Sequence, residues 1–161
     1  MRTLPTPKMT HPTLSPSARR ERGQSLVEFS LMGVFLTVLL VGVLDLGRAY
    51  FTYLALKDAA SEGSFFGSVY PACISTTDPA CAAPNNVDYR IRNSAPSGGL
   101  VSWTAADIQV DAPTPTPGEA ITVTVTYQYP IITPFIGAIV GGQTIQLSAR
   151  SVAVISSNGT P

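Results

Sequence analysis

The sequence predicts an α+β fold in which a long N-terminal helix packs on a small antiparallel β-sheet of about three strands. Two observations lead to this expectation. No proline interrupts residues 17–70 and a nearly pure apolar run occupies residues 29–44, so one helix of about 40 residues can form there. From about residue 100 the pattern changes to alternating apolar and polar residues, which is typical of half-buried strands.

Length and composition indicate one modest domain joined to an anchor. The chain has 161 residues, of which 45% are hydrophobic and only 12% are charged. Residues 1–23 carry five basic side chains and one acidic side chain, whereas residues 24–161 carry five basic and nine acidic ones. The region beyond the anchor is acidic and lacks the basic patch that binds nucleic acid, so nucleic acid is not an expected partner.

The segment 24–44 is expected to cross a membrane, and the segment 45–66 is expected to continue the same helix outside it. The run 29–44 is slightly short for a full span, but the whole segment 24–44 has an adequate length. Three basic residues precede the run, namely Arg19, Arg20 and Arg22, and few basic residues follow it. Because positive charges tend to stay in the cytoplasm, we expect a single pass with a cytoplasmic N-terminus and an extracytoplasmic C-terminus.

The segment 1–23 is expected to be a cytoplasmic leader. Its first 18 residues are rich in proline and threonine and show no periodicity, which is typical of disorder. A secretory signal has its apolar core before the cleavage site, whereas here the basic patch and Gly23 come before the apolar run. Cleavage after Gly23 would make Gln24 the new N-terminus and Glu28 the fifth residue of the mature chain.

This arrangement resembles the processing site of type IV pilin-like precursors. Residues 22–29 (RGQSLVEF) are similar to the N-terminal signature of TadE-like proteins, the pseudopilins of tight-adherence (Flp-type) pilus systems. The similarity continues at residues 45–48 (DLGR) and 59–63 (AASEG). It is strong over residues 22–64 and looser over residues 127–137.

The resemblance implies a minor pilin or pseudopilin in the cell (inner) membrane, assembled into or onto a pilus for cell adhesion, or into a related secretion apparatus. The implied partners are membrane lipid, other pilin subunits, a prepilin peptidase, and, indirectly, a cytoplasmic ATPase with a polytopic assembly platform. The alternative is a permanently anchored extracytoplasmic binding module, in which Gly23 is never cut.

Glu28 is the candidate residue for setting subunit register. A charged carboxylate in an apolar helix costs at least about a few kcal/mol in lipid when it is unpaired. After cleavage, the α-amino group of a neighbouring subunit could pair with it and favour one axial stagger. The alternative, that Glu28 faces water at the headgroup boundary, stays open. Gly33 and Thr37 are four residues apart and are candidates for close helix packing.

The projecting half of the helix is predicted to present an apolar stripe that seats the sheet. Residues at three- and four-residue spacing form it; they are Leu46, Ala49, Tyr50, Tyr53, Leu56, Ala60 and Phe65. Asp45 and Arg48 are expected to be surface charges. Gly63 and Gly67, with Pro71 after them, are expected to end the helix near residue 66.

Cys73 and Cys81 lie in a segment, 67–99, that is expected to be mostly loop. The predicted topology places both outside the membrane, where they can form a disulfide. The alternative is two unpaired structural thiols.

The segment 100–156 is predicted to form the antiparallel sheet, and residues 157–161 a tail. Strands are expected at residues 108–110, 120–129 and 144–155. The phase of the apolar residues shifts near Arg150 and Ser151, which suggests a bulge. The apolar connection 131–140 is expected either to be buried under the sheet or to be a contact surface.

No catalytic or metal-binding motif is recognisable beyond the leader. The only histidine is His11, and there is no Cys/His cluster, phosphate-binding loop or nucleophile elbow. The sequence therefore predicts a protein that is not an enzyme and that uses no cofactor or metal. A catalytic role would need acidic residues brought together in a pocket by the fold.

Overall fold

The computed structural model describes residues 17–74, 79–94, 99, 101–112 and 115–159. The remaining residues include 1–16 of the expected leader, 75–78 and 95–98 of the expected loop and 160–161 of the expected tail, and these lie outside the described residues. The chain divides into two compact units between Leu40 and Val41.

Helix α1, Ser17–Val69, is the longest element. It begins upstream of Gly23 and continues through Gly63 and Gly67, so the prediction that these glycines end the helix was wrong. Pro71 opens the next element, the 3-10 helix η1 (Pro71–Ile74), and a proline cannot continue the helical hydrogen bonding. Among the described residues, one helical stretch, Gly23–Val69, is long and apolar enough to cross a membrane, with a mean hydropathy of 2.3 in its most apolar part.

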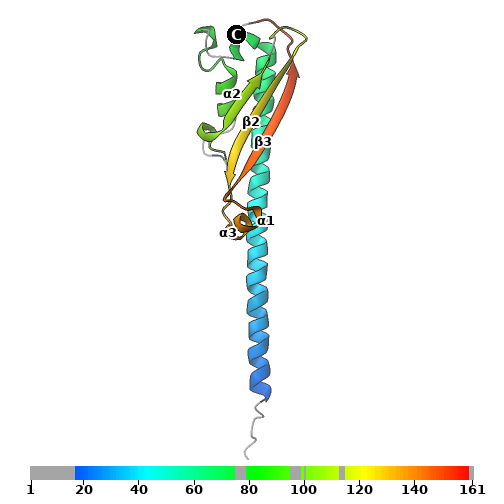
Figure 1. Cartoon of the computed structure of the whole chain (residues 1–161), viewed down its shortest axis with the longest axis vertical. Coiled ribbons are helices and arrows are strands. Elements are labelled where there is room, and N and C mark those ends of the chain that lie inside the picture. The colour runs from blue at the N-terminus through cyan, green and yellow to red at the C-terminus, as the bar shows by residue number, and fades with distance from the viewer. Residues whose placement is uncertain (1–16, 75–78, 95–98, 100, 113–114, 160–161) are drawn as a thin grey trace, which may run out of the picture. The chain divides into compact units, whose positions relative to one another are not determined.

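The second unit contains a three-stranded antiparallel sheet with the order β1-β2-β3. The strands are β1 (Asp107–Asp111), β2 (Ala120–Pro130) and β3 (Thr144–Val154). Figure 1 shows β2 and β3 running beside the C-terminal half of α1. This confirms the predicted α+β class, with a long apolar N-terminal helix and a small antiparallel sheet.

The expected bulge in β3 is absent. The pairing with β2 is continuous, from Ala120 opposite Val154 to Pro130 opposite Thr144. Strict alternation therefore places Ser151 on the inner face and leaves Val152 exposed. The inward serine is tolerated because its hydroxyl lies 2.8 Å from the hydroxyl of Ser64 on α1, and a buried polar group needs such a partner.

The core lies between α1 and the inner face of the sheet. The central strand contributes Ile121, Val123 and Val125, which are fully buried. The helix contributes mainly small residues, including the fully buried Ala59 and Ala60. Small side chains let the helix backbone approach the sheet closely, and the branched residues of β2 fill the space between them.

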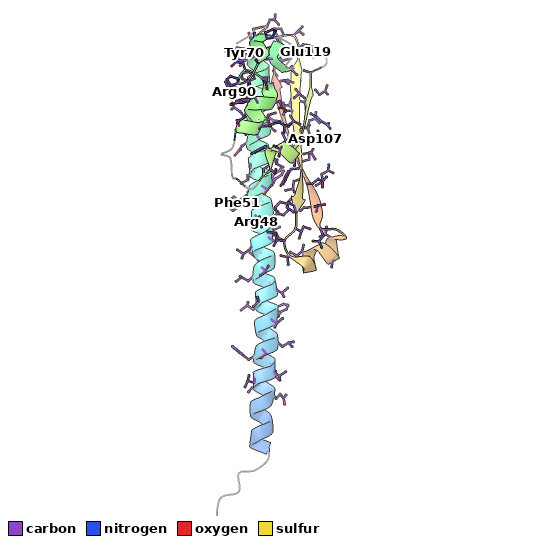
Figure 2. The ribbon with its side chains drawn as sticks, turned by 90° about the vertical axis from the view of Figure 1, so that its left-hand side faces the viewer. Arg48, Phe51, Tyr70, Arg90, Asp107 and Glu119 are labelled. Carbon is purple, nitrogen blue, oxygen red and sulfur yellow. A yellow bond between two sulfur atoms is a disulfide. The ribbon has the colours of Figure 1, made fainter. Side chains whose placement is uncertain are left out.

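The predicted apolar stripe on α1 was wrong at four of its positions. Ala49, Leu56 and Ala60 face the core, but the large residues of the stripe are exposed; they are Leu46, Tyr50, Tyr53 and Phe65. Thr52 is fully buried instead, and its hydroxyl donates to the carbonyl of Arg48 at 2.9 Å. Figure 2 shows Phe51 on the side of α1 away from the sheet. The face of α1 that is buried therefore differs from the predicted one, and it carries the smaller side chains.

Gly67 is a packing residue, and we expect Gly67→Ala to destabilise the second unit. A Cβ at this position would lie 2.3 Å from Cδ1 of Ile121, a fully buried side chain. Overpacking of this kind costs about 1–3 kcal/mol, against about 1 kcal/mol gained in helix propensity. The free energy of unfolding in detergent should therefore fall, as followed by the fluorescence of Trp103, the only tryptophan.

Gly47→Ala is the matched control for this prediction. A Cβ at Gly47 meets nothing within 4 Å, so this variant should be as stable as the wild type or up to about 1 kcal/mol more stable. Equal stability of the two variants would contradict the overpacking expected at Gly67.

Candidate functional site

Gly23 and Gln24 both lie within α1 and are exposed. A Cβ at Gly23 would meet nothing within 4 Å. Glycine in a helix interior is less favourable than alanine by about 1 kcal/mol, and packing in this structure gives no reason for it here. The processing role predicted for Gly23 and Gln24 stays a prediction.

Glu28 is exposed on α1 in the first unit. It lines a shallow apolar hollow on the helix surface with Ser25, Phe29, Leu31 and Met32. A carboxylate in such surroundings is open to a partner outside the chain. Its predicted role in subunit register stays a prediction.

Gly33 and Thr37 lie on one face of α1 and are linked by a hydrogen bond. The hydroxyl of Thr37 donates to the carbonyl of Gly33 at 2.8 Å, and Ser30 bonds in the same way to Leu26, also at 2.8 Å. These bonds satisfy hydroxyl donors that would otherwise be costly in lipid. A Cβ at Gly33 would meet nothing within 4 Å, so the face is open for another helix.

A buried carboxylate, Asp45, ties α1 to the sheet and to the segment that follows β2. We name Asp45, Tyr129 and Thr133 the Asp45 cluster. The hydroxyl of Tyr129 donates to Oδ1 of Asp45 at 3.0 Å, and the backbone N–H of Thr133 donates to Oδ2 at 3.2 Å. Asp45 is only 7% exposed, so the prediction that it is a surface charge was wrong. Arg48 is exposed, as expected.

Tyr129 remains a donor in this cluster at ordinary pH. Burial raises the pKa of its phenol, and the hydrogen bond to the Asp45 carboxylate and the negative charge there raise it further. Because the ordinary pKa of tyrosine is already near 10, the hydroxyl keeps its proton. The Asp45 cluster thus provides two fixed donors for one carboxylate. It joins Asp45 to Tyr129, 84 positions later in the sequence, and to Thr133, 88 positions later.

Helix α3 (Pro134–Val140) follows the Asp45 cluster. It lies in the apolar connection 131–140 between β2 and β3. Thr133 takes the N-cap position, and Gly141 closes the helix with a φ of 82°, the left-handed conformation that favours glycine. The sequence Thr133-Pro134 and the later glycine are start and stop signals that could have predicted this helix.

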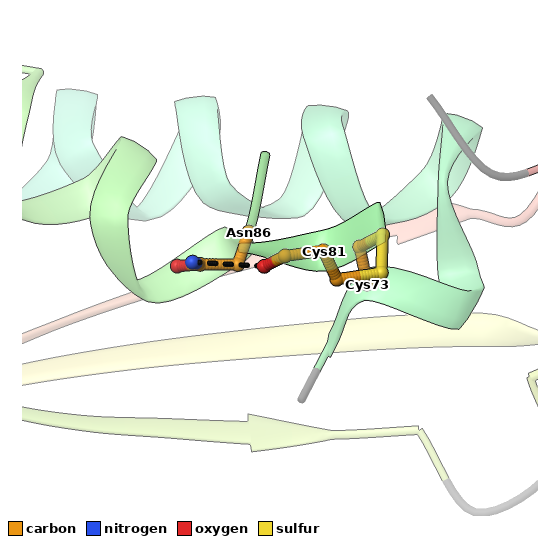
Figure 3. Close-up of a disulfide and its surroundings, with 3 residues drawn as sticks. All are labelled: Cys73, Cys81 and Asn86. Carbon is orange, nitrogen blue, oxygen red and sulfur yellow. Dashed lines mark hydrogen bonds between the residues drawn. A yellow bond between two sulfur atoms is a disulfide. The ribbon is translucent and has the colours of Figure 1, made fainter. Parts of the chain in front are cut away.

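Cys73 and Cys81 form a disulfide with Cα atoms 5.0 Å apart. It joins η1 to the 3-10 helix η2 (Pro79–Cys81), and both cysteines are fully buried. Figure 3 shows the amide of Asn86 bonded to the carbonyl of Cys81, at 3.1 Å. Asn86 also caps α2 (Val87–Asn93) by accepting from the N–H of Tyr89. The disulfide therefore fixes the loop and the start of α2 together.

Over the described part of the chain, no group of three or more His, Cys, Asp or Glu side chains could hold a metal ion. The prediction that the protein is not an enzyme was not tested and stays a prediction.

The architecture is that of the α+β, pilin-like class, with an apolar N-terminal helix followed by a small antiparallel sheet. Residues 23–64 match the TadE-like protein family, which confirms the resemblance predicted from residues 22–64. No curated protein and no solved structure matches the chain. The family match supports a general role as a minor pilin associated with the Tad pilus, and the apolar helix supports anchoring in a membrane.

Proposed function

We propose that this protein is a minor pilin or pseudopilin that is inserted in the inner membrane, cleaved after Gly23 and assembled through α1 into or onto a tight-adherence pilus. The observation that carries the proposal is the family match over residues 23–64. The match begins at the proposed cleavage position and covers the whole apolar run. The described residues that follow the matched segment include the disulfide and the sheet, and in this proposal they lie outside the membrane.

The proposed mechanism is ordered transfer of α1 from lipid to other subunits. Glu28 supplies a charge that is unfavourable in lipid and favourable beside the α-amino group of Gln24 on a neighbouring subunit. The open surfaces at Glu28 and Gly33 leave room for such a neighbour. In this proposal the chain performs no catalysis and needs no cofactor. A prepilin peptidase cuts it, and an ATPase with its membrane platform drives assembly.

We expect Glu28→Gln to block incorporation while leaving the protein in the membrane. Without the negative charge, the subunit loses its preference for one axial stagger, and the amount in sheared pili should fall by about tenfold, equivalent to about 1.4 kcal/mol. The measurement is quantitative immunoblotting of sheared pili and of membranes from the native host. Membrane levels should stay unchanged.

Glu62→Gln is the matched control, because it removes the same charge from the same helix outside the apolar run. It should leave incorporation at the wild-type level. Normal incorporation of the Glu28→Gln variant would contradict the proposed register role. A wild-type protein that never leaves the membrane would instead favour a permanently anchored binding module.

A further inference from the structure

Helix α3 lies beside the point where the apolar run of α1 ends. Figure 1 shows it against α1, at the end of the sheet where β2 stops and β3 begins. The backbone N–H just before α3, that of Thr133, bonds to Asp45. One turn further along α3, Cδ1 of Ile136 would lie 3.7 Å from a Cβ placed on Gly42. Helix α3 is thus level with Gly42 and Asp45, the last turn of the apolar run and the first residue after it.

The chain segment that contains α3 is free of charged residues. Residues 120–149, which include β2, α3 and most of β3, contain no Asp, Glu, Lys, Arg or His. Ile132 is 62% exposed and Val140 is 55% exposed. On α1 at the same level, Val43 and Leu44 are also exposed. The exposed side chain of Val140 on α3 therefore lies at the level of α1 where the apolar run ends with the exposed Val43 and Leu44.

The backbone of α3 is suited to a site with little water. The N–H groups of Ile136 and Gly137 bond to the carbonyl of Thr133, and those of Gly141 and Gly142 bond to the carbonyl of Gly137. Chain segments that meet lipid must satisfy their backbone groups internally. A short helix with closed ends meets this requirement better than an open loop of the same length.

From these observations we propose that Ile132 and α3 form a second membrane contact, which inserts apolar side chains into the headgroup layer of the phospholipid bilayer at its extracytoplasmic surface. The headgroup layer extends about 5–7 Å beyond the hydrocarbon on each side, and one helical turn is about 5.4 Å. If residues 24–44 span the hydrocarbon, the level of Gly42 to Asp45 falls at its boundary with this layer. The proposal rests on the membrane insertion of α1 in the proposed function. The Asp45 cluster then holds α3 at this depth.

The test measures the depth of single spin labels on the full-length protein in vesicles of phosphatidylcholine and phosphatidylglycerol. Both native cysteines are in the disulfide, so an added cysteine can be labelled alone. The test variants are Val140→Cys and Ile132→Cys. The matched control is Val152→Cys on β3, because Val152 is also 55% exposed. Leu36→Cys, within the apolar run, reports whether α1 itself is inserted.

The readout is the ratio of collision rates with oxygen, which concentrates in lipid, and with a water-soluble nickel complex. The labels at 140 and 132 should give ratios at least about threefold above that at 152, as expected for an interfacial element buried about 5–10 Å deep. Ratios equal to that at 152, with the label at 36 in lipid, would overturn the inference but leave the proposed function intact. A label at 36 that is exposed to water would overturn both. Labels at 140 and 132 shielded from both reagents would also overturn it, because another protein chain would then cover α3.

Discussion

Asp45→Ala should be the most damaging single substitution in the second unit. It leaves the N–H of Thr133 buried without its acceptor, and it leaves the hydroxyl of Tyr129 with only a long contact, 3.4 Å, to the backbone carbonyl of residue 45. Each unsatisfied group costs about 1–3 kcal/mol. We expect the free energy of unfolding to fall by about 2–5 kcal/mol. The measurement is urea unfolding of the detergent-solubilised full chain, followed by the fluorescence of Trp103.

Two further variants show whether the effect comes from the lost hydrogen bonds of Asp45 or only from the lost charge. Asp45→Asn can still accept from Thr133 through its oxygen and donate to the oxygen of Tyr129 through its nitrogen, so it should cost about 1 kcal/mol or less. Asp58→Ala removes the same side chain from an exposed position of α1 and should change stability by about 0.5 kcal/mol or less. Equal stability of Asp45→Ala and Asp58→Ala would contradict the burial of Asp45 and its role in holding the sheet to the helix.

Loss of the disulfide should have the second largest effect. Closing a loop between cysteines eight positions apart stabilises the folded state by about 2–3 kcal/mol in the chain-entropy model. Cys73→Ala with Cys81→Ala should lower the free energy of unfolding by that amount or more, because both side chains are fully buried. Urea unfolding of the full chain in detergent, without reductant, measures the difference.

Reductant provides the internal control for this prediction. Dithiothreitol should lower the unfolding midpoint of the wild type toward that of the double variant and leave the double variant unchanged. A thiol-reactive maleimide should not label the folded wild type, and should label it only once it has been unfolded and reduced. Rapid labelling of the native, membrane-extracted protein would show free thiols and contradict the disulfide.

The long helix and the central strand could be predicted because their signals are local. The absence of proline and the apolar run define most of α1, and the alternation in β2 gives its inner face directly. The family resemblance is equally local, because its residues lie within one helix. Such features need only the neighbouring sequence to be recognised.

The buried face of α1 could not be predicted from hydrophobicity alone. Large apolar residues such as Tyr50 and Phe65 were expected in the core, but the helix approaches the sheet through small residues. How closely the two elements pack decides which face is buried, and that distance is not encoded in any single segment. Gly63 and Gly67 therefore resemble a helix end in the sequence, although they form a close-packing surface in the structure.

The Asp45 cluster and the inward Ser151 depend on partners that are distant in the sequence. Asp45 is buried because β2 and Thr133 supply its donors, and Ser151 faces inward because Ser64 supplies a hydroxyl. A carboxylate after an apolar run and a serine in a strand both resemble surface residues until the fold places their partners beside them. Only the three-dimensional structure could reveal these contacts.

The measurement that tests the central claim most directly is the intact mass of the protein extracted from the membranes of its native host. Pilin-type processing predicts a mature chain that begins at Gln24, with or without a methyl group on its new α-amino group. Such a mass would support assembly through α1. A chain that keeps residues 1–23 in cells with an active prepilin peptidase would contradict the account and favour a permanently anchored binding module.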